Sequence, residues 1–188
     1  QEIVSSGPCR MVVLNPPVGE NLDGPVQESH LDGHRLNNRS VVTRLTCGIH
    51  TMLFAADVER DGLSRMMPSA SQGPIDVLKV PHHGAVSSLN REWLASLHPH
   101  YAVFSAGRHN RYGHPAAAVL SAYRLEGSTL LRTDRDGGVW FAGGVSEARF
   151  HVHRARDLVW QPTNGSSCLW ACEQANWNRV WKQWQARY

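Results

Sequence analysis

Long apolar runs are missing from this 188-residue sequence. No stretch approaches the ~18–20 apolar residues that span a bilayer, and no charged-then-apolar signal segment opens the chain. We therefore expect a soluble domain. The chain begins at Gln1 rather than at methionine, which indicates a piece of a longer protein.

Cysteine is also scarce. The four cysteines are Cys9, Cys47, Cys168 and Cys172, too few and too scattered for a disulfide scaffold. Cys168 and Cys172 lie four residues apart, a spacing that suits either a local disulfide or two thiols on one helix face. Both outcomes stay open, so the sequence does not fix the redox compartment.

The fraction of charged residues and the net charge are both modest. Charged residues make up 19% of the chain, the formal net charge is +3 and the pI is near 8.8. This balance permits a polyanionic partner but does not require one. Hydrophobic residues account for 41%, which excludes wholesale disorder and collagen-like repeats. The length suits one ordinary domain with its own core.

Predicted strands alternate with predicted helices from residue 50 to residue 142, which is typical of an α/β fold. The apolar and β-branched runs predict strands at 11–14, 40–46, 50–54, 75–80, 101–105, 129–133 and 139–142. Helices are expected at 58–67, where Pro68 ends the pattern, at 89–97 and at 115–126. Residues 18–39 show no periodicity and predict a long loop.

Acidic and imidazole side chains follow three of the predicted strands: Asp57, the pair His82-His83, and His114. Strand ends on one edge of a sheet are where α/β folds place ligand groups, and Asp and His suit zinc or manganese. Each residue also has an ordinary interpretation. Asp57 can cap the helix at 58–67, and His114 can be a loop residue. Adjacent histidines point to opposite sides of an extended chain, so at most one of the pair is a natural ligand by geometry.

Five segments follow one another along the chain: LNNRSVVTRL, TMLFAADVERDG, IDVLKVPHHGAVSS, PHYAVFSAGRHNRYGHP and LLRTDRDGGV. In this order they resemble the metallo-β-lactamase-like domain of ComEC-type DNA-uptake proteins over roughly residues 11–142, about 70% of the chain. VPHHG and NRYGHP are the most specific part. The resemblance implies an α/β fold of the αββα sandwich type, here its C-terminal half, which holds a divalent metal and hydrolyses DNA at the membrane.

The resemblance implies a role for each strand-end residue. Asp57, His83 and His114 are expected to hold the metal, zinc or manganese, with Asp57 as the bridging carboxylate. His82 and His83 are expected to be the catalytic pair beside it, one of them contacting the scissile phosphate. The ion would acidify a water and neutralise charge on the phosphorane.

Three basic residues precede His114: Arg108, His109 and Arg111. We expect them to hold phosphates of the substrate, and a solvated basic loop is the equally weighted alternative. The expected partners are DNA, as a single strand or the strand being degraded, and the rest of a membrane-channel polypeptide. The expected location is the extracytoplasmic face of a bacterial inner membrane.

The sequence departs from the family pattern at three places. Ala55-Ala56 stands where Thr-Gly is usual, Ala85 stands where Ser follows HHG, and the early HxHxDH metal motif belongs before the chain starts. Only a shortened version occurs, at 29–34 (SHLDGH), where the resemblance predicts a variable loop. A half-site should bind metal weakly and leave an apolar sheet face. We expect a second copy or the chain's own tail to cover that face.

The predicted domain spans 1–156, and a linker and a Trp-rich amphipathic helix occupy 157–188. Trp170, Trp177, Trp181 and Trp184 share one helical stripe, which suits packing on the domain, an interfacial helix or a base-stacking platform. Three functions follow for the whole chain. The first is a metal-dependent nuclease, the second a non-catalytic DNA- or partner-binding module on the same fold, and the third hydrolysis of another substrate.

Overall fold

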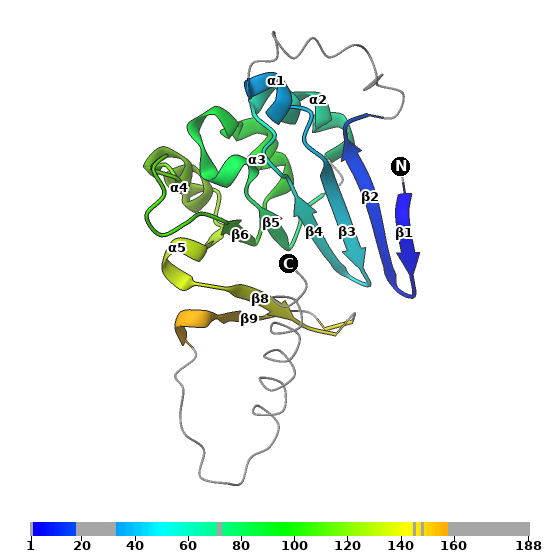
Figure 1. Cartoon of the computed structure of the whole chain (residues 1–188). Helices are drawn as coiled ribbons and strands as arrows, with labels where there is room; N and C mark the ends of the chain where they lie inside the picture. Colours follow the sequence, from blue (N-terminus) through cyan, green and yellow to red (C-terminus); the bar gives the residue numbers. More distant parts are fainter. Residues whose placement is uncertain (1, 18–32, 71–72, 145, 148, 158–188) are drawn as a thin grey trace, which may run out of the picture. The chain divides into compact units, whose positions relative to one another are not determined.

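The computed structural model of the chain describes residues 2–17, 33–70, 73–144, 146–147 and 149–157 (Figure 1). Residues 1–157 form one compact unit. The Trp-rich helix, with Cys168 and Cys172, lies outside the described residues. Within the described part, no helix is both long and apolar enough to cross a membrane.

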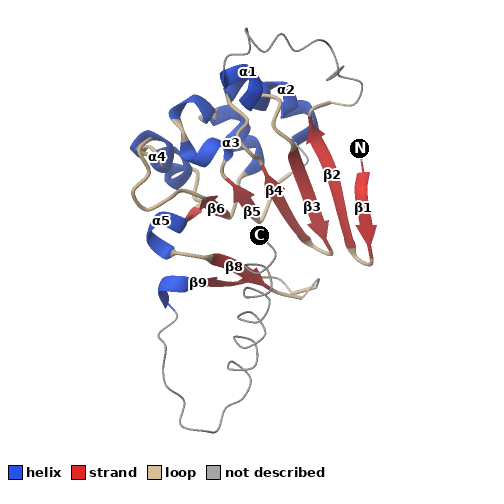
Figure 2. Cartoon of the chain, viewed as in Figure 1, coloured by secondary structure: helices blue, strands red, loops and turns tan. Residues whose placement is uncertain are grey.

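The main sheet has seven strands in the order β1-β2-β3-β4-β5-β6-β7 (Figure 2). Strands β1 to β4 pair antiparallel and strands β4 to β7 pair parallel. Strand β4 is therefore antiparallel to β3 and parallel to β5. Their bounds are Glu2–Ser6, Cys9–Asn15, Val42–Cys47, His50–Phe54, Val77–Lys79, Tyr101–Phe104 and Thr129–Arg132. A second sheet pairs β8 (Val139–Ala142) with β9 (His151–Arg154). The α/β prediction is confirmed.

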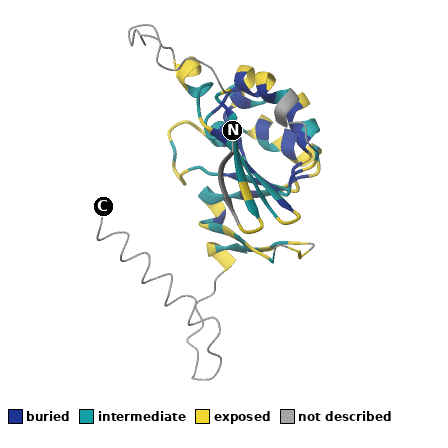
Figure 3. Ribbon diagram, turned by 90° about the vertical axis from the view of Figure 1, so that its right-hand side faces the viewer, coloured by how far each residue is buried: buried dark blue, intermediate teal, exposed yellow. Residues whose placement is uncertain are grey.

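Three helices connect the parallel strands and cover one face of the sheet (Figure 3). They are α2 (Arg60–Ala70), α3 (Arg91–Leu97) and α4 (Ala117–Leu125). Their apolar side chains meet those of the strands in one core, whose largest fully buried members include Leu53, Leu63, Leu78, Trp93 and Phe104. The other two α-helices of the described residues are the shorter α1 (Gly33–Asn37) and α5 (Thr133–Asp136).

The opposite face of the sheet is apolar but less covered. Side chains alternate between the two faces of a strand, so Met52 and Phe54 point away from the core that contains Leu53. Met52 is half-buried and Phe54 is 41% exposed. Tyr101 lies on this same face by alternation, and its ring contacts Phe141 of β8, 5.4 Å away between centroids.

The structure corrects two local predictions. Helix α2 runs to Ala70 instead of ending before Pro68, which falls in its last turn. The segment 18–39 is not loop throughout, since its described end contains α1. The residue that caps α2 is also not Asp57. The Asn38 side chain accepts hydrogen bonds from the N–H groups of Glu59 and Gly62, both at 3.0 Å.

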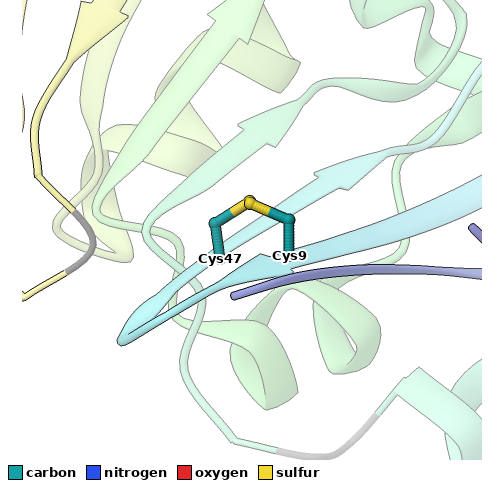
Figure 4. The surroundings of a disulfide bond; sticks show 2 residues. All are labelled: Cys9 and Cys47. Carbon is teal, nitrogen blue, oxygen red and sulfur yellow. A yellow bond between two sulfur atoms is a disulfide. The ribbon is translucent and has the colours of Figure 1, made fainter. Parts of the chain in front are cut away.

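A disulfide joins Cys9 of β2 to Cys47 of β3 (Figure 4). The two residues are partners in the antiparallel register, and their Cα atoms are 4.0 Å apart. No local sequence pattern indicates this pairing, because the two cysteines are separated by 38 positions. The bond ties together the ends of a segment that contains both strands and the long connection between them.

Candidate functional site

The strand-end residues gather at one edge of the sheet. Asp57 follows β4, His82 and His83 follow β5, and His114 lies in the loop after β6. These strands are parallel, so their carboxyl ends meet at a common edge, the place where open α/β sheets bind ligands. The main chain secures the arrangement, because the N–H of His82 donates to the carbonyl oxygen of Ala56 at 3.0 Å.

The His82-His83 segment is a left-handed turn and not an extended chain. The φ angles are +45° at His82, +56° at His83 and +83° at Gly84. The prediction that the two rings point to opposite sides is therefore wrong, because it assumed strand geometry. Their centroids lie 6.2 Å apart, and both rings contact acidic side chains at this edge. Two consecutive non-glycine residues in this region are unusual and are a mark of functional segments.

Asp57 and His83 lie close together at the site. The Oδ1 atom of Asp57 lies 3.4 Å from Nε2 of His83 and 3.7 Å from Nζ of Lys79. The other ring nitrogen of His83, Nδ1, is 2.6 Å from the carbonyl oxygen of Ser105 and donates to it. In the neutral ring this donation leaves Nε2 with a lone pair directed toward Asp57. Burial lowers the pKa of Lys79, and the Asp57 charge offsets part of that effect.

Glu59 is a buried carboxylate that the sequence analysis missed. Only 5% of the residue is exposed, and it contacts His34 through Oε2 and Asn37 through Oε1, the latter at 2.8 Å. Nδ1 of His82 lies 3.1 Å from the same Oε1 atom. Burial raises the pKa of Glu59, but the hydrogen bonds from Asn37 and His34 and the charges of the two histidines outweigh it and hold the pKa below its usual value. The signal available in sequence was its position two residues after Asp57.

His114 is held in place through its backbone. Asn110 accepts from the N–H of His114 at 2.9 Å and donates to its carbonyl oxygen at 2.7 Å. The ring lies 5.9 Å from that of His82 between centroids. Burial, followed by the charges of His82 and His83, lowers the pKa of His114. A lowered pKa favours the neutral ring, the form in which imidazole binds metals.

A pocket of about 490 Å³ opens beside these residues. His34, Glu59, His82 and His114 line it, together with Val86 and Tyr112. Of the three basic residues predicted to hold phosphates, Arg108 and His109 are exposed and do not line it. Arg111 is also exposed and lies against the ring of Tyr112.

The residues at this edge include ligand types that divalent metal ions accept. Among the described residues, however, no group of three or more His, Cys, Asp or Glu side chains is arranged so that it could hold a metal ion. Asp57 and His83 nevertheless present an oxygen and a nitrogen 3.4 Å apart, a separation compatible with two ligands of one ion. In addition, the buried Nδ1 atom of His114 has no hydrogen-bond partner within the described part of the chain, whereas Nδ1 of His82 lies beside the Glu59 carboxylate. A carboxylate with imidazoles is the ligand chemistry that zinc and manganese accept.

Sequence comparison relates the chain to competence proteins. It is 35% identical over 121 residues to ComE operon protein 3 of Bacillus subtilis, a match that covers 64% of this chain and 16% of that protein. It is 32% identical over 141 residues to competence protein ComA of Neisseria gonorrhoeae (73% and 20%) and 29% identical over 103 residues to recombination protein 2 of Haemophilus influenzae (55% and 13%). The chain thus spans a fifth or less of the length of these relatives. No family model matches it.

Proposed function

The chain is a homologue of the ComEC-type competence proteins, and we propose that it is a metal-dependent DNA phosphodiesterase domain of a DNA-uptake protein. In this proposal the seven-stranded sheet and its three helices are the C-terminal half of a metallo-β-lactamase-like αββα sandwich. The observation that carries the proposal is the convergence of Asp57, His82, His83 and His114 on one edge, with Asp57 and His83 at ligand separation.

Asp57, His83 and His114 would hold the ion. When bound, a zinc or manganese ion supplies Lewis acidity toward water and phosphate oxygens. The chain's own residues do the positioning. Ser105 fixes the ring of His83 through Nδ1, and Asn110 fixes the backbone of His114.

His82 has a different part in the proposed reaction. Its Nδ1 faces the buried Glu59, and its ring lines the 490 Å³ pocket, where it can donate a hydrogen bond to a phosphodiester oxygen. A carboxylate behind an imidazole orients the ring. His82 therefore recognises the phosphate, while Asp57 and His83 hold the ion.

A second candidate function is a non-catalytic DNA- or partner-binding module. It is favoured by Ala56, whose φ of +45° lies in the region where glycine carries no steric cost. The family pattern has glycine at this position, so the alanine places backbone strain directly before Asp57. Both functions use the same pocket and differ in whether bonds are cut.

The test compares DNA cleavage by wild-type chain, Asp57→Asn and Glu92→Gln in the presence of zinc or manganese. Glu92 is an exposed acid on α3 and serves as the matched control. We expect Asp57→Asn to lose about 100-fold or more of the cleavage rate and to retain less metal by elemental analysis, with Glu92→Gln unchanged. Equal cleavage by all three proteins would exclude catalysis at this site. DNA binding without cleavage in all three would establish the binding module instead.

The Cys9–Cys47 disulfide supports the extracytoplasmic part of the proposal, because such bonds persist in oxidising compartments. The incompletely covered face with Met52 and Phe54 supports a second copy of the chain as the partner that covers it. Light scattering on wild type and Phe54→Asp tests this: we expect a dimer that the charge dissociates, and a wild-type monomer would refute it.

A further inference from the structure

Tyr112 is an exposed aromatic side chain at the rim of the site. It is 66% exposed, the second most exposed of the large hydrophobic residues in the described part of the chain, and it lines the 490 Å³ pocket. Across the same pocket Val86 is 55% exposed. Two exposed apolar side chains therefore border the pocket, which the imidazoles of His82 and His114 also line. A ring as exposed as that of Tyr112 contributes little to the hydrophobic core.

The ring of Tyr112 is held in one orientation by its neighbours. Arg111 donates a hydrogen bond from Nη2 to the phenol oxygen at 2.8 Å, and its guanidinium carbon lies 4.9 Å from the ring centroid. The ring of His114 is nearly parallel to it, at 17° and 5.9 Å between centroids. A ring that is already ordered loses little conformational entropy when a ligand stacks on it. The Tyr112 ring is thus a preorganised surface for stacking.

The aromatic ring of Tyr112 and the nearby imidazoles together match the chemistry of a nucleotide. An unpaired base presents a π-face to stack on an aromatic ring, and its phosphate is an anion that imidazole N–H groups bind. The pocket volume lies within the range of small-ligand sites. A base inside a duplex is stacked between its neighbours and cannot use the ring without leaving the helix.

We propose that Tyr112 stacks an unpaired nucleobase of the DNA and so makes the site select single-stranded over double-stranded substrate. This inference rests on the proposed function for the identity of the ligand as DNA. Arg111 contacts the ring and lends positive charge near the backbone, and His82 receives the phosphate of the same nucleotide. The selectivity resides in the ring, because the phosphate contacts are available to any strand.

Binding without cleavage isolates the stacking contribution. Fluorescence anisotropy in EDTA would compare three labelled probes of equal length: a single-stranded oligodeoxynucleotide, its abasic counterpart and a duplex. The proteins are wild type, Tyr112→Ala, Tyr112→Phe and Trp140→Ala. Trp140 is a 39% exposed ring on β8 and is the control for loss of an exposed aromatic residue.

We expect wild type to bind the single strand about 5- to 150-fold more tightly than the abasic probe, the range for one base stacked on an aromatic side chain. Tyr112→Ala should lose that difference and bind the abasic probe as wild type does. Tyr112→Phe should keep most of the affinity difference between the two probes, and Trp140→Ala should keep all of it. Equal affinity of wild type for single-stranded and abasic probes, unchanged single-strand affinity in Tyr112→Ala, or no binding by wild type would overturn the proposal.

This result is separable from that of the nuclease test. A base preference that depends on Tyr112, together with equal cleavage by wild type and Asp57→Asn, would retain the stacking site and refute the enzyme. Loss of cleavage in Asp57→Asn with no effect of Tyr112→Ala on binding would do the reverse.

Discussion

Removal of the Cys9–Cys47 disulfide should destabilise the domain by a large fraction of its total stability. The bond closes a segment of 38 positions that contains β2, β3 and the connection between them. In the unfolded chain, cutting the bond releases the two ends of that segment. The folded state keeps its β2–β3 ladder in either case, so the effect acts mainly through the unfolded ensemble.

The size of the effect follows from the loop length. For about 38 residues the chain-entropy relation gives about 13 cal/mol/K, which is about 4 kcal/mol at 25 °C. Domains of this size shift their melting temperature by about 2–4 °C per kcal/mol. We therefore expect the melting temperature to fall by about 8–16 °C, against a typical total stability of about 5–15 kcal/mol.

Thermal unfolding followed by circular dichroism measures this shift. The background protein carries Cys168→Ser and Cys172→Ser, so that a reductant acts only on the described pair. This background protein, which keeps Cys9 and Cys47, is compared with the same protein carrying Cys9→Ala and Cys47→Ala. Both proteins are measured with and without reductant. We expect reductant to lower the melting temperature of the first protein and to leave the second unchanged.

Two results would refute the reasoning. One is a double variant that melts at the same temperature as the oxidised protein, since the unfolded chain would then gain nothing from release of the loop. The other is an oxidised protein whose mass shows two free thiols at Cys9 and Cys47. That second result would also remove the support that the disulfide gives to an extracytoplasmic location.

Two further predictions concern packing and acid stability. Gly84→Ala should cost about 2–5 kcal/mol in chemical unfolding, because φ is +83° and the new Cβ would meet Phe104 at 2.9 Å. Gly113→Ala, where φ is +68° but nothing lies within 4 Å, should cost only about 1–2 kcal/mol, and equal losses would exclude the steric argument. The hydrogen bond from Arg132 lowers the pKa of Asp134, so its stabilisation exists above the ordinary aspartate pKa and disappears as pH falls through the folded value. Unfolding at pH 7 and at about pH 3 should show a smaller acid loss in Asp134→Asn than in wild type, and identical losses would contradict this.

Much of the fold and the core of the site were predictable because their signals are local. Apolar runs such as residues 75–80 and 101–105 identify buried strands by composition alone. Asp57, the His82-His83 pair and His114 each follow such a strand. Parallel pairing then brings strand ends together without any knowledge of the side-chain contacts.

Contacts between distant segments were not predictable in the same way. Glu59 meets His34 across 25 positions, and the outcome depends on the path of the connection before β3. Asn38 takes the capping role that Asp57 was free to fill, which leaves the Asp57 carboxylate for Lys79 and His83. No periodicity encodes either choice.

The sequence by itself determined the α/β class, the placement of Asp57, the His82-His83 pair and His114 after strands, and the relation to competence proteins. Only the tertiary structure decided that both rings of the His82-His83 pair face acidic side chains and that Cys9 pairs with Cys47. The physical reason is the same for both. A left-handed turn and a strand register are chosen by the free energy of the whole packed chain, through backbone hydrogen bonds and close approaches between residues that are far apart in sequence.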